Sequence, residues 1–471
     1  MTTTPPSNLE TVKECIYINL FDEVTVDLLE SDRERETVVY ERLERRWLGN
    51  LKIPFTTLYL NSKIEGTFRI NVPPVLLSYE NEPRPWLTGL SDAASNHTYL
   101  SFFMTVEPCL QLPEIFRDQF ESAEPEKVLN EVEKWRQSVI PRFPDRMIKL
   151  MSVDLSGKWI FVTRFLRSLA PPEELLVGNR ESLETMELLA RFVSLIPTVS
   201  DSITFPGLCD IWSTSDQFLQ MLTGDEEEHA ILLCSYFLHL GKRGRAAAGI
   251  GHPGRTHGVR GDLGIPTVGC LISPDNVWAN IQKNNHPSRI NFDVSKSGDW
   301  KPFFSRSFPN PGLRSIQPSF LTYNASDAGY VQKLQEDLKN SLKESIQKWR
   351  SNISTTWNSN CNKILHNILT RLERNVGRTA SDDSLQELEQ VLKKYKVDGF
   401  PLTMPYTDID AVIETVFATS VHLTEDRNAE FSVAVYIHSY PCCVLAVWVY
   451  VAVLIPRKDT ENDVQAAEIL D

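Results

Sequence analysis

The sequence predicts an α+β protein, in which strands and helices occupy largely separate stretches of the chain. Three observations support this prediction. Residues 1–80 are rich in runs of strand composition, residues 331–392 repeat leucine at helical spacing, and residues 431–455 hold two apolar, β-branched runs around a Ser-Tyr-Pro turn. With 471 residues, of which 42% are hydrophobic, the chain is long enough for about three domains with cores of their own.

The net charge and the cysteine pattern narrow the class of protein. A formal net charge of -14 disfavours a general nucleic-acid binder, because an acidic surface repels phosphate. The eight cysteines are scattered and include no C-x-x-C pair of the kind that binds zinc, which is typical of reduced thiols in a cytosolic protein. The opening MTTTPPSNLE has no apolar core, so we expect no secretory signal.

Three runs of strand composition open the chain. They are ECIYINLFDEVTVDLL (14–29), RRWLGNLKIPFTTLYL (45–60) and KIEGTFRINVPPVLL (63–77). The charged stretch Glu30–Arg46 lies between the first two runs, and we interpret it as a solvated loop or short helix. A further strand is predicted over SGKWIFVTRFLRSL (156–169).

Helical periodicity dominates the middle of the chain. Residues 124–143 begin a helix with Leu129, Val132 and Trp135 at helical spacing, and Ser182 is expected to cap an amphipathic helix that Pro197 ends. Another helix is expected to start at Ser215 or Asp216 and to break at Gly224. It resumes in the apolar run Ala230–Leu240, which predicts a helix buried on most sides.

The last part of the chain is predicted to be helical and then to form a hairpin. Residues 331–392 are largely helical, with a stripe at Leu334, Leu338, Leu342 and Ile346, and 403–420 form one more short helix. Strands at 431–438 and 442–455 then form a buried antiparallel hairpin. The second run is shorter than the roughly 20 apolar residues that span a bilayer, so we interpret it as a strand. Residues 457–471 are predicted to be a disordered acidic tail.

Several long stretches together resemble the C-terminal third of the coiled-coil and C2 domain-containing protein 2 family, 2A and 2B. The resemblance spans most of residues 10–455 and is carried by RRWLGNLKIPFTTLYLNSKIEGTFRINVPPVLL, FPGLCDIWSTSDQFLQMLTGDEEEHAILLCSYFLHLGK, VGCLISPDNVWANIQ, INFDVSKSGDWKPFFSRSFPNPGL and GFPLTMPY. The family's long coiled-coil region is not in this sequence, so we expect a fragment or a partial gene model.

The resemblance implies a non-catalytic scaffold of the ciliary transition zone and basal body, in the cytoplasm and cytoskeleton. Such a protein supports cilium assembly and limits protein entry into the cilium. The implied partners are other transition-zone proteins of the Meckel syndrome and tectonic complex, with peripheral membrane contact through C2 surfaces and no nucleic acid.

The resemblance also implies a domain organisation. In chain order it consists of the C-terminal part of a C2 β-sandwich (10–80), a linker with a helix (81–145), a degenerate transglutaminase-like, papain-related domain (146–330), a helical segment (331–396), a C-terminal α/β element with the hairpin (397–456) and the tail (457–471).

A calcium-binding C2 rim needs several converging carboxylates, because Ca²⁺ takes six to eight oxygen ligands. The acidic residues of this region are dispersed and lack the D-x-D pattern; they are Asp22, Glu23, Asp27, Glu30 and Asp32. We therefore interpret them as a solvated acidic turn and expect neither a metal nor a cofactor.

A papain-related enzyme needs a thiolate at the start of its core helix. Aligning that helix on Leu240-Gly241 places Gly224 at the expected glycine and Glu226 at the cysteine position, and a carboxylate cannot replace the thiol. We therefore expect no catalytic residues. The alternative is a cysteine-dependent, transglutaminase-like hydrolase or transferase that uses Cys234 or Cys209.

The other polar residues around this helix have structural interpretations. Residues 225–228 are expected to cap the helix without a metal, because the helix dipole favours carboxylates at its start. His229 and His239 are interpreted as surface or packing residues, and Asp210 and Trp212 as packing at the helix entry.

Residues 242–264 contain Gly249, Gly251 and Gly254 in the spacing G-x-G-x-x-G. A dinucleotide-binding loop needs a strand before this motif and a helix after it. Here a helix precedes it and Pro253 interrupts it, so we expect a flexible basic loop without nucleotide affinity. Relatives have strands at this point, and active ones would place His and Asp there. We interpret 242–264 as an alternative or mispredicted exon.

Overall fold

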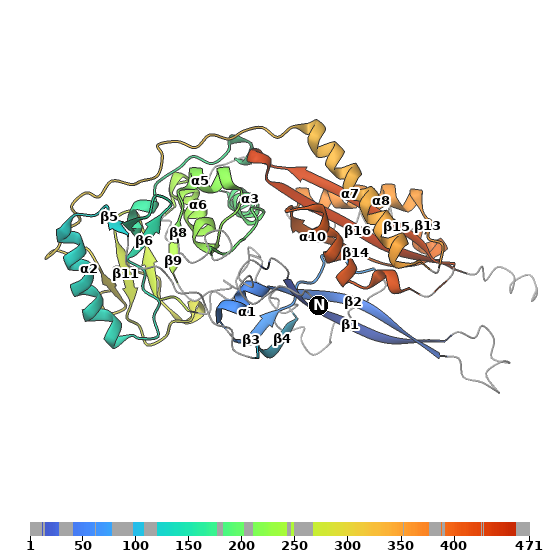
Figure 1. Cartoon of the computed structure of the whole chain (residues 1–471), viewed down its shortest axis with the longest axis horizontal. Coiled ribbons are helices and arrows are strands. Elements are labelled where there is room, and N and C mark those ends of the chain that lie inside the picture. Colours follow the sequence, from blue (N-terminus) through green and yellow to red (C-terminus); the bar gives the residue numbers. More distant parts are fainter. Residues whose placement is uncertain are drawn as a thin grey trace, which may run out of the picture.

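The computed structural model confirms a mixed α+β architecture (Figure 1). The described residues are 12, 15–27, 41–61, 63–77, 98–107, 120–176, 182–201, 211–242, 246–248, 267–351, 353–375, 388, 391–424, 426 and 428–457. We call 15–107 the N-terminal unit, 120–325 the middle unit and 328–457 the C-terminal unit. The middle and C-terminal units lie at opposite ends of the molecule, and the N-terminal strands run beneath the C-terminal sheet.

The N-terminal unit contains two antiparallel strand pairs. Strands β1 (Cys15–Asp27) and β2 (Glu41–Pro54) form a long ribbon with a bulge at Leu20/Phe21, and β3 (Lys63–Arg69) pairs with β4 (Tyr99–Thr105). The helix α1 (Phe55–Asn61) joins the two pairs. Their shared core is made of buried apolar side chains from β2, α1, β3 and the residue after β3, and partly buried side chains of β1 and β4 pack against it. The buried members are Leu51, Ile53, Leu58, Ile64, Phe68 and Ile70.

Three expectations for this unit differ from the structure. The strand predicted over 45–60 is wrong from residue 55, because Phe55, Leu58 and Tyr59 have the i, i+3, i+4 spacing of a helix and Leu58 and Tyr59 are buried. The loop predicted over Glu30–Arg46 is wrong from Glu41, which already pairs with Asp27. Strand β4 extends the pairing well past the expected boundary at residue 80.

The middle unit contains two small sheets and four helices among its described residues. One sheet has the order β5-β7-β6-β8 and the other β12-β11-β10-β9. The elements are β5 (Glu121–Ser122), α2 (Glu126–Val139), β6 (Met151–Asp154), β7 (Lys158–Phe161), α3 (Leu183–Ser194), β8 (Ile211–Trp212), α5 (Ser215–Met221), α6 (Glu226–His239), β9 (Ala246–Ala248), β10 (Cys270–Ile272), β11 (Val277–Asn280) and β12 (Trp300–Pro302).

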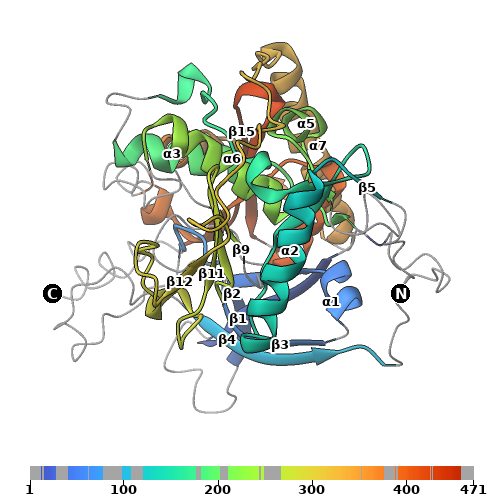
Figure 2. The ribbon, with the colours of Figure 1, turned by 90° about the vertical axis from the view of Figure 1, so that its left-hand side faces the viewer.

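Helix α2 belongs to the core of the middle unit rather than to a linker. Its buried residues Val132, Trp135 and Val139 share a cluster with residues of both sheets, including Phe161 and Val277. Figure 2 shows α2 beside the strands β9 and β11. The packing therefore joins the predicted linker to the middle unit. Short 3-10 turns connect the elements at Ile140–Arg142, Val162–Phe165, Glu173–Leu175 and Pro287–Arg289.

Strand β9 corrects one expectation about residues 242–264. Ala246–Ala248 pair antiparallel with Cys270–Ile272, so this part is a sheet edge rather than a flexible loop. The reason is a non-local contact. Strand β10 pairs with β11 on one side, and the backbone groups on its other side pair with Ala246–Ala248. Gly249, Gly251 and Gly254 lie outside the described residues.

The C-terminal unit is one four-stranded sheet between helices. The strand order is β13-β15-β16-β14, from β13 (Thr356–Trp357), β14 (Tyr395–Pro405), β15 (Glu430–Ser439) and β16 (Leu445–Pro456). Its helices are α7 (Ala328–Trp349), α8 (Ser359–Arg374) and α10 (Ile409–Ala418), with 3-10 turns at Val421–Leu423 and Pro441–Cys443.

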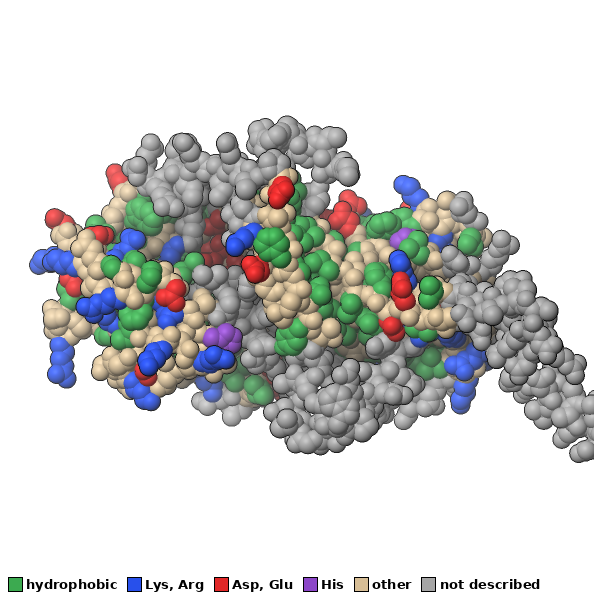
Figure 3. All heavy atoms as spheres, turned by 90° about the horizontal axis from the view of Figure 1, so that it is seen from below, with side chains coloured by type: hydrophobic (Ala, Val, Ile, Leu, Met, Phe, Trp, Pro, Cys, Tyr) green, Lys and Arg blue, Asp and Glu red, His purple; other side chains and the backbone are tan. Residues whose placement is uncertain are grey.

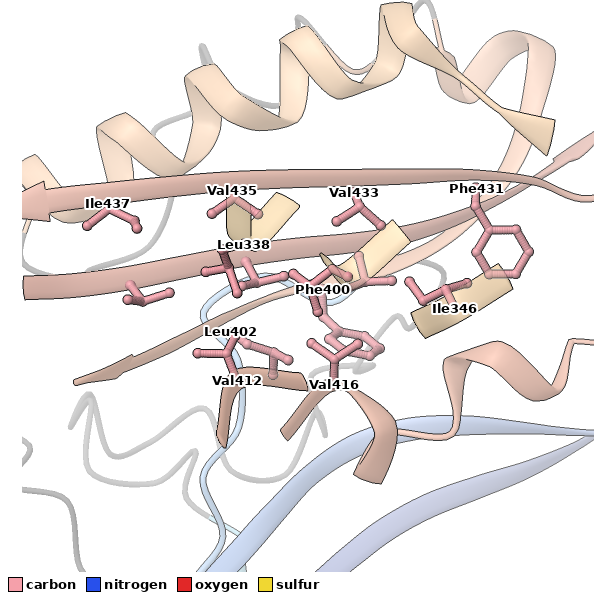
Figure 4. Packing of buried hydrophobic residues seen from close by; sticks show 14 of the residues in the cluster. Leu338, Ile346, Phe400, Leu402, Val412, Val416, Phe431, Val433, Val435 and Ile437 are labelled. Atoms are coloured by element: carbon pink, nitrogen blue, oxygen red, sulfur yellow. The ribbon is translucent and has the colours of Figure 1, made fainter. Parts of the chain in front are cut away.

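The alternation of side chains along the sheet explains why helices cover both faces. Val433, Val435 and Ile437 point to the same side as Phe400 and Leu402 (Figure 4), where they share a cluster with the predicted leucine stripe of α7 and with α10. The even-numbered residues of β15 and β16, such as Ala434, Trp448 and Tyr450, pack against α8 on the other face.

The predicted hairpin is confirmed as β15 and β16, and the helix over 331–346 as part of α7. The helical segment ending at 396 is wrong at Tyr395 and Lys396, which begin β14. The short helix predicted over 403–420 starts only at Ile409, because Thr403–Pro405 pair with β16. No helix in the described part of the chain is long and apolar enough to cross a bilayer.

Candidate functional site

The start of α6 is where a papain-related enzyme would hold its nucleophile. Asp225 is the N-cap of this helix and Glu226 is its exposed first residue, in the position where the sequence places the missing cysteine. Gly224 precedes them because a Cβ there would lie 2.8 Å from Cε2 of the Phe218 ring. The described turn into the helix therefore presents carboxylates, and no thiol, at this position.

A capping box explains two of these carboxylates. The Glu227 backbone N–H donates to Oδ1 of Asp225 at 3.1 Å, and the Asp225 N–H donates to Oε2 of Glu228 at 3.0 Å. These bonds satisfy N–H groups that a helix start leaves without partners. The expected capping by residues 225–228 is confirmed for Asp225 and Glu228.

Glu228 also connects α6 to the strand before α5. Its Oε1 accepts the Ser213 backbone N–H at 2.8 Å, while Oδ2 of Asp201 accepts the Ile211 N–H at 2.6 Å. The carboxylates of Asp201, Asp225 and Glu228 thus converge, with ligand atoms within 4.8 Å of one another. We call these three residues the acidic cluster.

The acidic cluster is shielded from solvent. Asp225 is 9% exposed and Glu228 is 3% exposed. Burial raises the pKa of Asp225 far above its ordinary value, and the hydrogen bond with Glu228 and the charges of Glu227, Glu228 and Asp201 raise it further.

Cys234 does not lie at this site. It is in the third turn of α6, 5% exposed, and packs in the apolar cluster with Ile231 and Phe161. A reactive thiol needs an accessible, electropositive setting, and this position offers neither. The second sequence candidate, Cys209, lies outside the described residues.

The histidines of α6 are held by the fold. His229 Nδ1 lies 2.5 Å from the Asp225 carbonyl oxygen, and its Nε2 lies 2.9 Å from that of Ile196. Its ring packs edge-on against Phe218, with centroids 4.8 Å apart. His239 is the last residue of α6, far along the helix from the acidic cluster. His229 is therefore a packing residue, as expected.

Trp212 is buried at the helix entry, with its ring centroid 5.3 Å from that of Phe165, which confirms its expected packing role. Asp210, its expected companion, lies outside the described residues.

The acidic residues that the sequence analysis interprets as a solvated turn, and not as a C2 calcium site, are only partly described; Glu30 and Asp32 lie outside the described residues. Asp22 and Glu23 face Arg46 and Arg45 across the β1–β2 ribbon, and Glu23 pairs with Arg45 at 2.9 Å.

A groove lies between the middle and C-terminal units. It has a volume of about 440 Å³ and is lined by the start of α7, the end of β15 and Glu174. The amide oxygen of Gln335 in its wall accepts the Ile437 backbone N–H at 3.0 Å. The described residues that line the groove are about equally polar and apolar and include no cysteine or histidine, so they offer a binding surface rather than a catalytic one.

Glu373 of α8 connects the middle and C-terminal units through buried hydrogen bonds. It is 3% exposed and accepts hydrogen bonds from Arg191 of α3 at 2.9 Å, from the Tyr440 hydroxyl at 2.5 Å and from the Trp448 indole N–H. Arg191 also donates to Thr403 at 3.0 Å. We call this group of donors and acceptor the Glu373 hub.

Local sequence patterns indicate neither the convergence of Asp201 with Asp225 and Glu228 nor the Glu373 hub. Ser213 follows β8, which pairs in parallel with β6, and Asp201 accepts a hydrogen bond from Ile211 of the same strand. No local sequence pattern predicts these two contacts. The sequence indicates the burial of Glu373 only by its position. It directly follows Leu372, at the edge of the apolar stripe formed by Leu365, Leu369 and Leu372.

Comparisons with known proteins match this architecture. A model of the CEP76 peptidase-like domain matches residues 210–262 and 262–303, in two parts that meet within 242–264. A model of the C-terminal domain of the centrosomal protein of 76 kDa matches residues 328–456, which cover α7 to β16.

Three curated relatives extend the similarity. Protein CC2D2B of Homo sapiens is 34% identical, over 96% of this chain and 33% of its own length. Coiled-coil and C2 domain-containing protein 2A of Drosophila melanogaster is 24% identical, over 94% and 35%. The centrosomal protein of 76 kDa of Homo sapiens is 23% identical, over 68% and 55%. The chain thus spans about a third of the length of the first two relatives.

Proposed function

Since this chain belongs to the coiled-coil and C2 domain-containing protein 2 family, we propose that it is a non-catalytic scaffold of the ciliary transition zone. It supports cilium assembly and the diffusion barrier through protein–protein contacts. The observation that carries this proposal is the start of α6, where Asp225 caps the helix and Glu226 occupies the position of the nucleophile.

The relatives support a place at the base of the cilium. The matches to centrosomal proteins cover the middle and C-terminal units, and the centrosome and the basal body are related structures. The proposed partners are other transition-zone proteins of the Meckel syndrome and tectonic complex. Membrane contact would be peripheral, through C2 surfaces.

The proposed domain organisation follows the three units. The N-terminal unit is part of a C2 β-sandwich that reaches past residue 80 to β4, and the middle unit is a degenerate transglutaminase-like domain that includes α2. The C-terminal unit combines the helical segment with the hairpin, since α7 and α8 pack on the two faces of its sheet.

A scaffold requires its binding surfaces to stay in fixed positions relative to one another. The Glu373 hub supports this requirement, because it fastens α3 of the middle unit to α8 and β16 of the C-terminal unit. The surface chemistry is compatible with protein partners. On the described part of the face in Figure 3, Lys and Arg side chains are interspersed with Asp and Glu side chains.

Localisation and depletion in ciliated cells test the proposal. A fluorescent tag on the protein is expected to give a signal at the base of the cilium, and depletion is expected to reduce the number of ciliated cells. A diffuse cytosolic signal together with normal cilia after depletion would refute the scaffold role.

The peptidase-like match supports a second candidate, a cysteine-dependent hydrolase or transferase that uses Cys234 or Cys209. It predicts that an electrophilic thiol probe labels one of these residues faster than it labels exposed Cys443. Peptide mass spectrometry after brief labelling distinguishes the candidates. Preferential labelling of Cys443 favours the scaffold.

A further inference from the structure

A small cavity lies beside the acidic cluster, and four of its eight lining residues carry side-chain oxygen atoms. The cavity has a volume of about 10 Å³ and is lined by Asp201, Glu228, Ser213 and Thr223, among others. Asp225 completes the acidic cluster at its edge, with a carboxylate oxygen within 4.8 Å of the other two.

Two hydroxyl groups at this cavity have no hydrogen-bond partner among the described residues. They are Oγ of Ser213 and Oγ1 of Thr223, and Ser213 is only 2% exposed. A buried hydroxyl without a partner costs about 1–3 kcal/mol, so native proteins rarely leave one without a ligand, ion or water. This observation is independent of the carboxylates and indicates that the cavity has an occupant.

We propose that the acidic cluster, together with Ser213 and Thr223, binds a Ca²⁺ ion. The five groups offer only oxygen atoms, which suit a hard cation and disfavour zinc. Oxygen ligands at roughly 2.3–2.6 Å from Ca²⁺ lie up to about 5 Å apart, which fits carboxylate atoms within 4.8 Å of one another. One bidentate carboxylate brings the ligand number to six, the lower end of the range for Ca²⁺.

The size of the cavity discriminates between Ca²⁺ and Mg²⁺. A volume of about 10 Å³ accommodates roughly one water-sized occupant. Mg²⁺ loses its water shell reluctantly and usually keeps several waters, whereas Ca²⁺ accepts a ligand set made mainly of protein oxygens. The site therefore selects Ca²⁺ because it has no room for a hydrated ion.

The proposal departs from the expectation that capping alone explains residues 225–228. Capping uses Oδ1 of Asp225 and Oε2 of Glu228, and it leaves the two hydroxyls at the cavity without a partner among the described residues. Neither Asp225 nor Glu228 forms an ion pair with Lys or Arg among the described residues.

Terbium luminescence tests the site, because Tb³⁺ replaces Ca²⁺ and is sensitised by a nearby indole. Trp212 directly precedes Ser213 and is the expected donor. With the full chain, we expect sensitised Tb³⁺ emission that Ca²⁺ displaces, and a Ca²⁺-dependent rise in the melting temperature. Trp212→Phe should remove most of the emission and keep the rise.

Two variants localise the ion and one serves as control. Asp201→Asn removes a carboxylate ligand and should weaken Ca²⁺ binding by roughly tenfold or more. Ser213→Ala removes a buried hydroxyl without a partner, so it should weaken Ca²⁺ binding while leaving the melting temperature of the Ca²⁺-free protein equal to or above that of the wild type. Asp216→Asn, in the first turn of nearby α5, should leave binding unchanged.

Three results would overturn the proposal. The first is a melting temperature that Ca²⁺ does not change, and the second is equal Ca²⁺ affinity in wild type, Asp201→Asn and Ser213→Ala. The third is an equal rise with Mg²⁺, which would contradict the argument from cavity size. Each result leaves the scaffold function untouched, because that function does not require the ion.

Discussion

Replacing Glu373 tests whether the middle and C-terminal units are held together by a buried charge. Glu373→Ala removes the acceptor for Arg191, Tyr440 and Trp448 and leaves their donors inside the protein. Removing one partner of a buried ion pair costs about 3–5 kcal/mol. The Arg191 side chain is 17% exposed, so water recovers part of this, and we expect a loss of about 2–4 kcal/mol.

A double-mutant cycle separates the ion pair from the rest of the hub. Arg191→Met in the Glu373→Gln background removes both charges. The loss in the free energy of unfolding of the double variant should therefore be smaller than the sum of the losses of the two single variants. Urea unfolding followed by circular dichroism gives the four free energies. The coupling energy is expected to exceed about 1 kcal/mol.

An exposed ion pair provides the matched control. Glu336 lies 3.9 Å from Lys339 on the surface of α7, and such pairs contribute less than about 1 kcal/mol. Glu336→Gln should therefore change the free energy of unfolding only slightly. If Glu373→Ala is no more destabilising than Glu336→Gln, the hub does not hold the units together and the reasoning fails.

Three further predictions concern pH and packing. Arg191 and the Tyr440 and Trp448 donors outweigh burial and hold the pKa of Glu373 below its ordinary value, so its contribution should be lost as pH falls through that pKa in an acid titration. Burial raises the pKa of Asp398 to about 6, so Asp398→Asn should stabilise the protein at pH 7.5, by up to about 3 kcal/mol, and not at pH 4. Gly224→Ala should cost about 1–3 kcal/mol against the Phe218 ring, whereas Gly298→Ala, with open space, should be neutral in thermal unfolding.

The elements that local patterns predict are those whose periodicity matches their burial. The stripe from Leu334 to Ile346 faces a sheet, and the hairpin strands alternate between two apolar faces, so both were predicted from sequence. Strand β14 was missed because Pro401 and Pro405 interrupt it. It is an edge strand, where a missing N–H is tolerated, and only its pairing with β16 defines it.

The sites could be predicted only in part, for a related reason. The missing thiol at Glu226 follows from spacing along one helix, which the sequence displays. The acidic cluster needs Asp201 to come back to α6 across 24 residues and Ser213 to reach it through β8. Such convergence depends on strand pairing between distant segments, which composition and periodicity do not encode.

Complementation of depleted ciliated cells tests the non-catalytic role most directly. The full chain carrying Cys209→Ala and Cys234→Ala lacks both candidate nucleophiles, whereas Glu373→Ala weakens the hub and retains every cysteine. The scaffold account predicts that the double cysteine variant restores cilia as well as the wild type does, and that Glu373→Ala restores fewer. A double cysteine variant that reaches the wild-type protein level and melting temperature but restores no cilia would contradict it.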